Sequence, residues 1–260
     1  MLTLGFDTSN YTTSVAAFDG VGGRNCSRLL DVKPGELGLR QSDALFAHVK
    51  RLPELVQALC ASVELKDITA IGVSTRPRAV EGSYMPCFLA GVNAATAFAA
   101  ARSIPLIYTT HQQGHAAAAL FAARGADLFT QKVLLFHISG GTTDLLLCDE
   151  VRTITQLGTS TDLYAGQAVD RVGVKLGFAF PAGAEVSRLA AACPEEIRPK
   201  SSVRGMQCSL SGLENQCNAL LAAGKSPEYV CKYCLLCVAD TVVKMTKAAQ
   251  KEYPGLPVVC

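Results

Sequence analysis

Apolar residues along the chain form short runs that alternate with longer segments of helical period. The short runs predict strands at residues 2–6, 14–18, 68–74, 105–108, 133–138, 144–148 and 256–260. The longer segments predict helices at residues 45–59, 87–101, 111–123, 165–176, 184–192 and 229–251. Strands that alternate with helices predict an α/β architecture.

The order of strand, polar turn and strand occurs twice, around turns at residues 7–13 and 139–143. Two copies about half a chain apart predict a duplicated domain. We expect the boundary near residues 125–131, and therefore one domain over residues 1–128 and a second over residues 129–260.

The first helix carries two further signals. Ser42 stands just before the apolar stripe and is predicted to cap the helix, because serine accepts from the free N–H groups of a first turn. Pro53 stands inside the stripe and is predicted to kink or split the helix.

Composition narrows the class of protein. Hydrophobic residues make up 49% and charged residues 18% of the 260 residues, which predicts a substantial core. The net charge of +2 excludes a polybasic protein that binds nucleic acid by charge alone. Eleven scattered cysteines without a leader at Met1 predict reduced thiols and a cytoplasmic location. The longest apolar stretch, residues 87–101, is too short for a membrane span, so we expect no membrane association.

His111 and His115 are the first candidate site. Four residues apart on a helix, their Cβ atoms lie about 5–6 Å apart, which suits the binding of one cation. Gln112 stands where metallopeptidases place the glutamate that acts as general base. A third ligand, expected to be a carboxylate, would come from elsewhere in the chain. The alternative is a pair of histidines on a solvated helix face.

The turn between residues 138 and 143 is the second candidate site. Its Ser139-Gly140-Gly141-Thr142-Thr143 sequence allows a tight turn whose backbone N–H groups face an anion. The alternative is an ordinary glycine hairpin. The similar turn at residues 7–13 favours phosphate binding, although the chain contains neither a P-loop nor a G-x-G-x-x-G fingerprint.

Two further patterns have open interpretations. Asp170 precedes the Phe180-Pro181-Ala182-Gly183 turn and could hold ribose hydroxyls, or could pair with Arg171 or Lys175 on a solvated helix face. Cys231, Cys234 and Cys237 have the spacing of an iron–sulfur motif. Because the surrounding residues have helical period, we expect these thiols to pack in the core instead.

In this order and spacing the segments resemble one family, the catalytic subunit of tRNA N6-adenosine threonylcarbamoyltransferase, formerly labelled O-sialoglycoprotein endopeptidase. The resemblance spans nearly the whole chain and rests on Gly5-Phe6-Asp7-Thr8-Ser9, His111 and His115, Ser139-Gly140-Gly141-x-Thr143, residues 158–170, Pro181-x-Gly183 and Cys208-Ser209-Leu210-Ser211-Gly212-Leu213. It implies the actin-like ATPase (ASKHA) fold, with two ribonuclease-H-like domains and a central cleft.

The resemblance also implies a reaction and its participants. The reaction is transfer of a threonylcarbamoyl group from threonylcarbamoyl-adenylate, an ATP-type nucleotide ligand, to N6 of the tRNA adenosine beside the anticodon. His111 and His115 would bind one divalent metal ion, Fe²⁺ or Zn²⁺. The substrate and nucleotide would contact His137, Ile138, Ser139, Gly140, Gly141, Asp170, Gly183 and Ser187, with Asp7, Thr8 and Ser9 as a phosphate turn. Partners would be tRNA and other proteins of a tRNA-modification complex; no catalytic acid or base is assigned.

The chain departs from the family pattern at several points. Arg76-Pro77-Arg78 stands in place of Gly-Pro-Gly, Gly140-Gly141-Thr142-Thr143 in place of Gly-Gly-His-Thr, and Glu214 in place of lysine. The family's Gly-Gly-Val-x-x-Asn adenine loop and its late aspartate ligand have no counterpart before Cys260. We therefore expect either a fragment or a truncated copy with reduced activity.

Three other functions stay open from the sequence. A non-catalytic paralogue would keep the fold and act as a partner or scaffold of the true synthase, although the retained His111 and His115 count against it. A metallopeptidase-like protein would need a base that Gln112 cannot supply. An ATP-dependent phosphotransferase follows from fold analogy alone.

Overall fold

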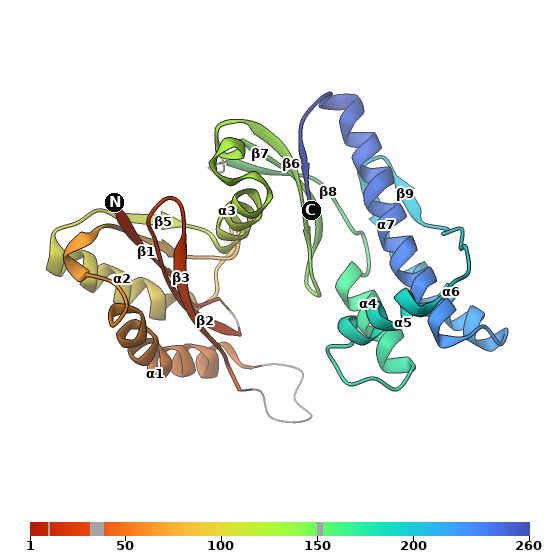
Figure 1. Ribbon diagram of the computed structural model, residues 1–260, viewed down its shortest axis with the longest axis horizontal. Coiled ribbons are helices and arrows are strands. Elements are labelled where there is room, and N and C mark those ends of the chain that lie inside the picture. Colours follow the sequence, from red (N-terminus) through yellow and green to blue (C-terminus); the bar gives the residue numbers. More distant parts are fainter. Residues whose placement is uncertain (10, 32–38, 150–152) are drawn as a thin grey trace. The chain divides into compact units, whose positions relative to one another are not determined.

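The computed structural model describes residues 1–9, 11–31, 39–149 and 153–260, and these form two compact units (Figure 1). The first unit comprises Met1–Ala118 and the second Ala119–Cys260, so the division falls within helix α3 (His111–Arg124). None of the described helices is both long and apolar enough to cross a membrane.

The first unit is built on a five-stranded sheet in the order β3-β2-β1-β4-β5. Its strands are β1 (Leu2–Asp7), β2 (Thr12–Phe18), β3 (Gly23–Leu29), β4 (Ile68–Ser74) and β5 (Leu106–Thr109). The first three strands pair antiparallel, whereas β1, β4 and β5 run parallel. The carboxyl ends of the parallel strands therefore meet at one edge of the sheet.

One face of this sheet forms the core of the unit. Helices α1 (Gln41–Cys60) and α2 (Phe88–Arg102) cover it, and a short 3-10 turn, Leu65–Asp67, precedes β4 (Figure 1). Alternate strand residues such as Leu4, Phe6, Val15, Ile71 and Val73 point into this core and are almost fully buried. Most residues on the opposite face are small or polar, Phe18 and Ile107 being exposed apolar exceptions, and that face carries the candidate site.

The second unit is built on a four-stranded sheet in the order β11-β6-β7-β8. A 3-10 segment, Gly125–Thr130, leads into β6 (Lys132–Ile138), β7 (Thr143–Asp149) and β8 (Thr153–Thr159), and β11 (Val258–Val259) pairs parallel with β6. The remaining elements are α4 (Ala165–Lys175), α5 (Gly183–Ala192), β9 (Ser202–Arg204), β10 (Gln207–Ser209), α6 (Ser211–Ala222) and α7 (Pro227–Glu252).

Cys231, Cys234 and Cys237 lie on α7 and are almost fully buried among apolar side chains. Burial, together with the nearby Cys217 and Glu228, raises the pKa of Cys231 to about 11, which keeps this thiol protonated. No group of three or more metal-binding side chains is found among the described residues. The prediction that these cysteines pack in the core is confirmed.

The predicted cap of the first helix is wrong. The N-cap residue of α1 is Arg40, whereas Ser42 lies inside the helix and its hydroxyl contacts the neighbouring Asp43 carboxylate. Pro53 does not split the helix, which runs without interruption from Gln41 to Cys60. Strands β3 and β8, which carry few apolar residues, were not predicted, and neither was helix α6.

Candidate functional site

The candidate site lies at the edge of the first sheet where the parallel strands end. Asp7 is the last residue of β1, and Ser74 is the last residue of β4. His111 follows the end of β5 and begins α3. Because β4 lies between β1 and β5, this topology brings Asp7 and His111 together although they are 104 residues apart in sequence.

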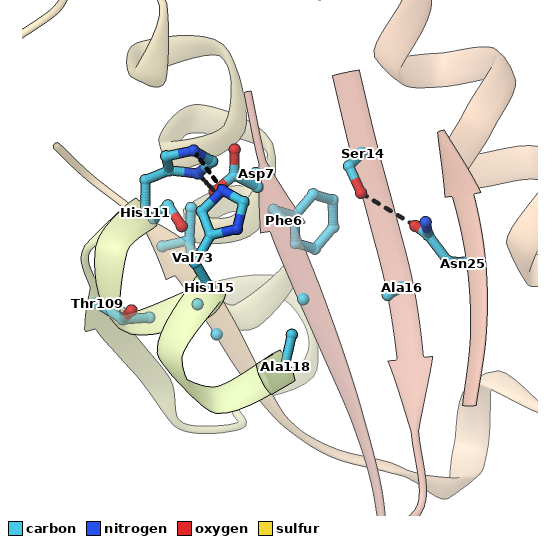
Figure 2. Close-up of a pocket in the computed structure, with 14 residues that line it drawn as sticks. Phe6, Asp7, Ser14, Ala16, Asn25, Val73, Thr109, His111, His115 and Ala118 are labelled. Carbon is cyan, nitrogen blue, oxygen red and sulfur yellow. Dashed lines mark hydrogen bonds and ion pairs between the residues drawn. The ribbon is translucent and has the colours of Figure 1, made fainter. Parts of the chain in front are cut away.

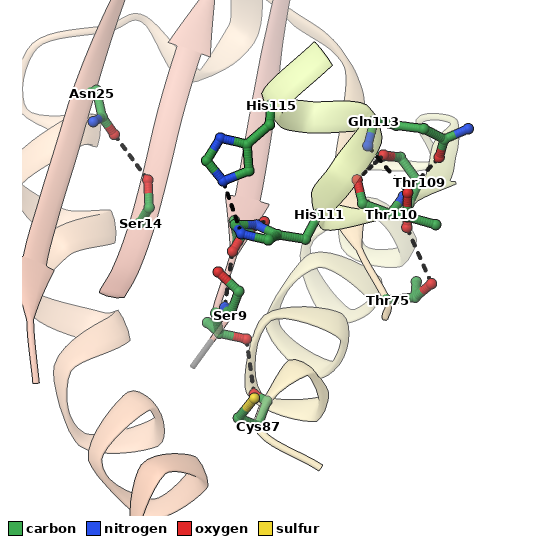
Figure 3. Close-up of polar contacts among 12 residues, drawn as sticks. Ser9, Ser14, Asn25, Thr75, Cys87, Thr109, Thr110, His111, Gln113 and His115 are labelled. Carbon is green, nitrogen blue, oxygen red and sulfur yellow. Dashed lines mark hydrogen bonds and ion pairs between the residues drawn. The ribbon is translucent and has the colours of Figure 1, made fainter. Parts of the chain in front are cut away.

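Asp7, His111 and His115 form a continuous polar chain (Figure 2), and Figure 3 shows the contact between the two histidines. Asp7 Oδ2 lies 3.0 Å from His111 Nδ1, and His111 Nε2 lies 2.9 Å from His115 Nε2. A carboxylate only accepts hydrogen bonds, so Nδ1 of His111 carries a proton and donates it to Asp7. The two rings meet edge to face, with centroids 4.3 Å apart.

The ionisation of Asp7 and His115 depends on their burial and on the groups around them. Burial alone would raise the pKa of Asp7, but hydrogen bonds from His111, Ser74 and Ser9, together with the charge of His111, lower it to about 2. Burial and the nearby His111 lower the pKa of His115, against the opposing effect of the Asp7 carboxylate. At neutral pH, Asp7 is therefore ionised and His115 is neutral.

A cavity of about 540 Å³ adjoins the histidines on the open face of the sheet (Figure 2). Gly5 pairs in register with Ala16 on one side and with Gly72 on the other, so small residues occupy the middle of this face. A Cβ atom added at Gly5 or at Gly114 of α3 would meet nothing within 4 Å. The cavity exists because these residues lack side chains that would fill it.

A polar row borders the cavity. In the register of the sheet, Asp7 is opposite Ser14, and Ser74 is opposite Thr109. Ser14 donates to the side-chain oxygen of Asn25 on β3, 3.0 Å away, at the wall farthest from the histidines (Figure 3). The cavity therefore combines an open apolar floor with hydroxyl, amide and imidazole groups at its rim.

The predicted phosphate turn at Asp7, Thr8 and Ser9 is tied to the protein itself. Ser9 N–H donates to Asp7 Oδ1 at 2.9 Å, so both oxygens of Asp7 have partners. The Thr8 hydroxyl is buried, donates to the carbonyl of Cys87 at 2.9 Å and accepts from Gly91 N–H at 3.1 Å. These contacts fix the turn to the start of α2; Asn10 lies outside the described residues.

In the second unit, the turn that follows β6 closes on its own serine. Ser139 Oγ accepts from the N–H groups of Gly141 and Thr142, each at 3.1 Å, and lies 2.8 Å from the Thr142 hydroxyl. The Ser139 carbonyl accepts from Gly166 N–H in the first turn of α4, at 3.1 Å. Two of the N–H groups expected to face an anion therefore have an internal acceptor.

The two residues before this turn, His137 and Ile138, end strand β6. His137 is half-buried and is opposite Asp144 in the register of β7. Ile138 is opposite Thr143 and is 37% exposed. Ser139, Gly140 and Gly141 are all exposed, so this turn offers an accessible surface beside α4.

Asp170 lines a second cavity of about 540 Å³ in the second unit. Asp170 Oδ1 accepts from Ala182 N–H at 2.8 Å, which fixes the residue just before α5. Asp170 lines this cavity together with Gln167, Arg171 and Phe180. Gly183 begins α5 and leaves open space where a Cβ would stand, and Ser187 is exposed one turn later. Arg171 pairs with Glu214 at 2.9 Å rather than with Asp170.

The histidine pair meets the basic requirement for holding a metal ion. Two nitrogens bound to one ion at about 2.0–2.1 Å lie about 3 Å apart, close to the separation of the His111 and His115 Nε2 atoms. Metal-binding histidines usually donate their other ring N–H to a carboxylate, as His111 does to Asp7. No third ligand joins the pair among the described residues, so other coordination positions would be left open.

Comparison with known proteins identifies the family. The family model for tRNA N6-adenosine threonylcarbamoyltransferase matches residues 36–259. The chain belongs to this family. The resemblance drawn from its motifs is thus confirmed by an independent match across most of the chain.

Individual relatives agree with this assignment. A Limosilactobacillus fermentum protein named tRNA N6-adenosine threonylcarbamoyltransferase is 30% identical over 268 residues, which cover 97% of this chain and 75% of the relative. A Streptococcus pneumoniae protein of the same name is also 30% identical, over 80% of this chain and 62% of the relative. The chain thus spans about three fifths to three quarters of these relatives.

Similarity to a solved structure supports the fold. The crystal structure of T. kodakarensis HypF matches 98% of this chain and 40% of its own, with a TM-score of 0.57 and 12% sequence identity. At this identity the likeness concerns the fold alone. The prediction of an α/β protein with the actin-like ATPase fold is confirmed.

The contact between Asp7 and His111 was not predicted from the sequence. A carboxylate was expected to join the histidines from elsewhere, but Asp7 was assigned to a phosphate turn. The available signal was topological: the strand that ends at Asp7 and the strand that precedes His111 both run parallel to β4. Side chains that follow neighbouring parallel strands gather at one edge of a sheet.

Proposed function

We propose that this chain transfers a threonylcarbamoyl group from threonylcarbamoyl-adenylate to N6 of the tRNA adenosine beside the anticodon. The observation that carries the proposal is the Asp7–His111–His115 chain of contacts, found in a member of this family at the mouth of an open cavity. In this reaction N6 attacks the carbamoyl carbon, N6 loses a proton, and the bond to the adenylate oxygen breaks to release AMP.

In this proposal His111 and His115 hold one divalent metal ion, iron or zinc, through their Nε2 atoms. When bound, such an ion supplies Lewis-acid polarisation of the reacting carbonyl or phosphate oxygen. Asp7 holds the proton on His111 Nδ1, so that Nε2 stays a lone-pair donor. The neutral His115 offers the second lone pair once its ring proton moves to Nδ1 or to solvent.

In this proposal the second unit binds the nucleotide. His137 to Gly141 would line the phosphate and threonylcarbamoyl end, while Asp170, Gly183 and Ser187 would lie on the ribose or adenine side. The exposed Ser139–Gly141 turn and the cavity beside Asp170 support this assignment. The proposed division of labour is a metal-binding domain over residues 1–128 and a nucleotide-binding domain over residues 129–260.

The partners follow from the reaction. The acceptor is tRNA, the donor is threonylcarbamoyl-adenylate, and other proteins of a tRNA-modification complex would assist. The proposed location is the cytoplasm, where tRNA is modified before translation. A peptidase role has no support at Gln112, because its amide does not titrate and its side chain is buried away from the histidines' cavity.

The test is a transfer assay with unmodified tRNA and threonylcarbamoyl-adenylate, read by mass spectrometry of the released nucleosides. It is run with and without an extract from bacteria depleted of their own transferase, because the extract supplies partner proteins. The Limosilactobacillus fermentum relative is the positive control. We expect modified adenosine from this chain and at least a hundredfold lower rate from His111→Ala. No product from this chain, while the relative is active, would favour the non-catalytic paralogue.

A further inference from the structure

The loop at residues 75–87 joins β4 to α2 and borders the histidine site. Its first residue, Thr75, donates through its N–H to the Thr109 carbonyl at 2.9 Å. The next two carbonyls, of Arg76 and Pro77, accept from the N–H groups of His111 and Gln112, each at 3.0 Å. The loop is therefore fixed to the first turn of the helix that carries both histidines.

The side chains of this loop beside the histidine site include two arginines and an exposed tyrosine. Arg76 is exposed, Arg78 is half-buried, and Tyr84 is 64% exposed. Two arginines stand against one acid, Glu81, so the loop is net positive. No ion pair between described residues involves Arg76.

The backbone of the loop is ordered by its own contacts. Arg78 N–H donates to Ser83 Oγ at 3.0 Å, and Ser83 N–H donates to the Val80 carbonyl at 3.2 Å. Gly82 adopts φ +74°, a left-handed conformation that glycine accepts without strain, and the tight bend turns the chain toward Tyr84. An ordered backbone limits the entropy lost when exposed side chains bind a ligand.

We propose that Arg76, Arg78 and Tyr84 form a contact surface for single-stranded RNA, called here the RPR loop surface. The planar guanidinium of arginine matches the geometry of a phosphate group. An exposed tyrosine offers a flat face on which an unstacked base can stack. This inference rests on the proposed function and deepens it, because the RNA concerned is the acceptor tRNA.

Position and chemistry both favour RNA over an acidic protein as the occupant. The RPR loop surface is attached to the helix of His111, so a nucleotide bound there would lie next to the base that must react. An acidic protein surface would be attracted by the arginines but would not depend on the aromatic face of Tyr84. The family usually carries Gly-Pro-Gly at the position of Arg76-Pro77-Arg78, and that segment has no charged side chains. This contact would therefore be specific to family members with the two arginines.

The experiment measures binding of the whole chain to an unmodified tRNA transcript at salt concentrations from about 50 to 200 mM. Arg76→Gln and Arg78→Gln should each lower the slope of log affinity against log salt by about 0.7–0.9, the value for one lost phosphate contact. Tyr84→Ala should weaken binding about five- to hundredfold at constant slope, because one base loses its stacking partner. Tyr84→Phe, which keeps the ring, should bind like the wild type.

Two matched controls remove the same side chains elsewhere in the first unit. Arg102→Gln changes an exposed arginine in the last turn of α2, at the opposite end of that helix from the loop. Tyr108→Ala changes a tyrosine, 61% exposed, whose register partner Val73 faces the core, so it lies on the other face of the sheet from the cavity. Both should leave affinity and slope unchanged, and thermal melting should verify that all variants are folded.

The outcomes separate this inference from the function on which it rests. Binding by the wild type with unchanged slope and affinity in folded Arg76, Arg78 and Tyr84 variants would overturn the RPR loop surface and leave the proposed function standing. A reduced slope in the arginine variants without any effect of Tyr84→Ala would indicate a general basic surface and also overturn it. Equal losses of affinity or slope in Arg102→Gln and Tyr108→Ala would also overturn the RPR loop surface. Absence of tRNA binding by the wild type, with or without the extract, would overturn both.

Discussion

The two sheets of this protein begin with the same hairpin plan, but the turns of the two hairpins are held in different ways. In the first, Asp7 accepts from Ser9 N–H of its own turn with one carboxylate oxygen and contacts His111 with the other. In the second, Ser139 directs its hydroxyl back onto the N–H groups of its own turn, and the turn packs against α4. The first turn places a charged oxygen against a histidine of the candidate site. The second turn uses its serine hydroxyl to accept hydrogen bonds from its own backbone N–H groups.

This difference shows how two copies of one hairpin can take different roles, one orienting a histidine and the other fixing the backbone of a turn. A charged group at the edge of a sheet can orient a histidine and set which ring nitrogen is free. A neutral hydroxyl in a closed turn keeps the backbone in one shape and leaves an accessible surface. The comparison predicts that changes at the first turn alter metal binding, while changes at the second turn alter stability and leave metal binding unchanged.

The largest effect should come from Asp7→Asn. An amide that accepts less strongly no longer fixes the proton on His111 Nδ1, so metal affinity should fall about ten- to hundredfold. Competition with a chelator of known affinity measures this change. Ser139→Ala, the matching change in the second hairpin, should leave metal affinity within twofold. Equal losses in the two variants would remove the distinction between the turns.

A pair of glycine substitutions sharpens the comparison in terms of stability. A Cβ at Gly166 would lie 2.6 Å from the Ser139 carbonyl carbon, so Gly166→Ala should lower the free energy of unfolding by about 1–3 kcal/mol. Gly114→Ala, in the helix of the histidines, meets nothing within 4 Å and should raise it by up to about 1 kcal/mol. Urea denaturation measures both; a stable Gly166→Ala would show that the second turn has room to move.

The smallest expected effect is at Asp162, whose carboxylate accepts hydrogen bonds from a neighbouring segment of the second unit. Its oxygens accept from Leu210 N–H at 2.8 Å and from the hydroxyls of Ser209 and Ser211, both at 2.6 Å. Burial alone would raise the pKa of Asp162, but the hydrogen bonds from these residues and from Leu163 N–H lower it. A lowered pKa means that the stabilisation is present above pH about 4 and is lost as the pH falls.

Asp162→Asn should therefore lower the free energy of unfolding by about 1–2 kcal/mol at neutral pH, because its hydrogen bonds are to a charged acceptor at an exposed position. The gap between variant and wild type should narrow as both are acidified to about pH 3, because the Asp162 carboxyl of the unfolded chain is then mostly protonated while that of the folded chain is still ionised. Urea denaturation at the two pH values provides the measurement. A gap that does not depend on pH would show that the charge of Asp162 contributes nothing.

Much of the fold follows from apolar periodicity, and the exceptions have a common cause. Residues 68–74 were predicted as a strand and form β4 with the same bounds, because the run is apolar and buried. Strand β3 was not predicted, because six of its seven residues are exposed at the sheet edge and only Cys26 is half-buried. An edge strand whose side chains are mostly exposed leaves no hydrophobic pattern.

The candidate site shows the same limit at the level of side chains. The spacing of His111 and His115 is local, so helix geometry alone predicts that they face one another. The contact of Asp7 with His111 depends on the order of β1, β4 and β5 in the sheet, which no local pattern encodes. The cavity beside them depends on which glycines share a register, and this too is a property of strand pairing.

The most direct test of this account is the metal content of the whole chain after loading with Fe²⁺ or Zn²⁺ and removal of free ion, measured by elemental analysis. The wild type should retain about one ion per chain, and His111→Ala and His115→Ala should retain almost none, because each leaves a single imidazole. His137→Ala, which removes an imidazole from the second unit, should retain the wild-type amount. Retention of the ion by His111→Ala, or its loss from His137→Ala alone, would contradict the assignment of the metal to the Asp7–His111–His115 site.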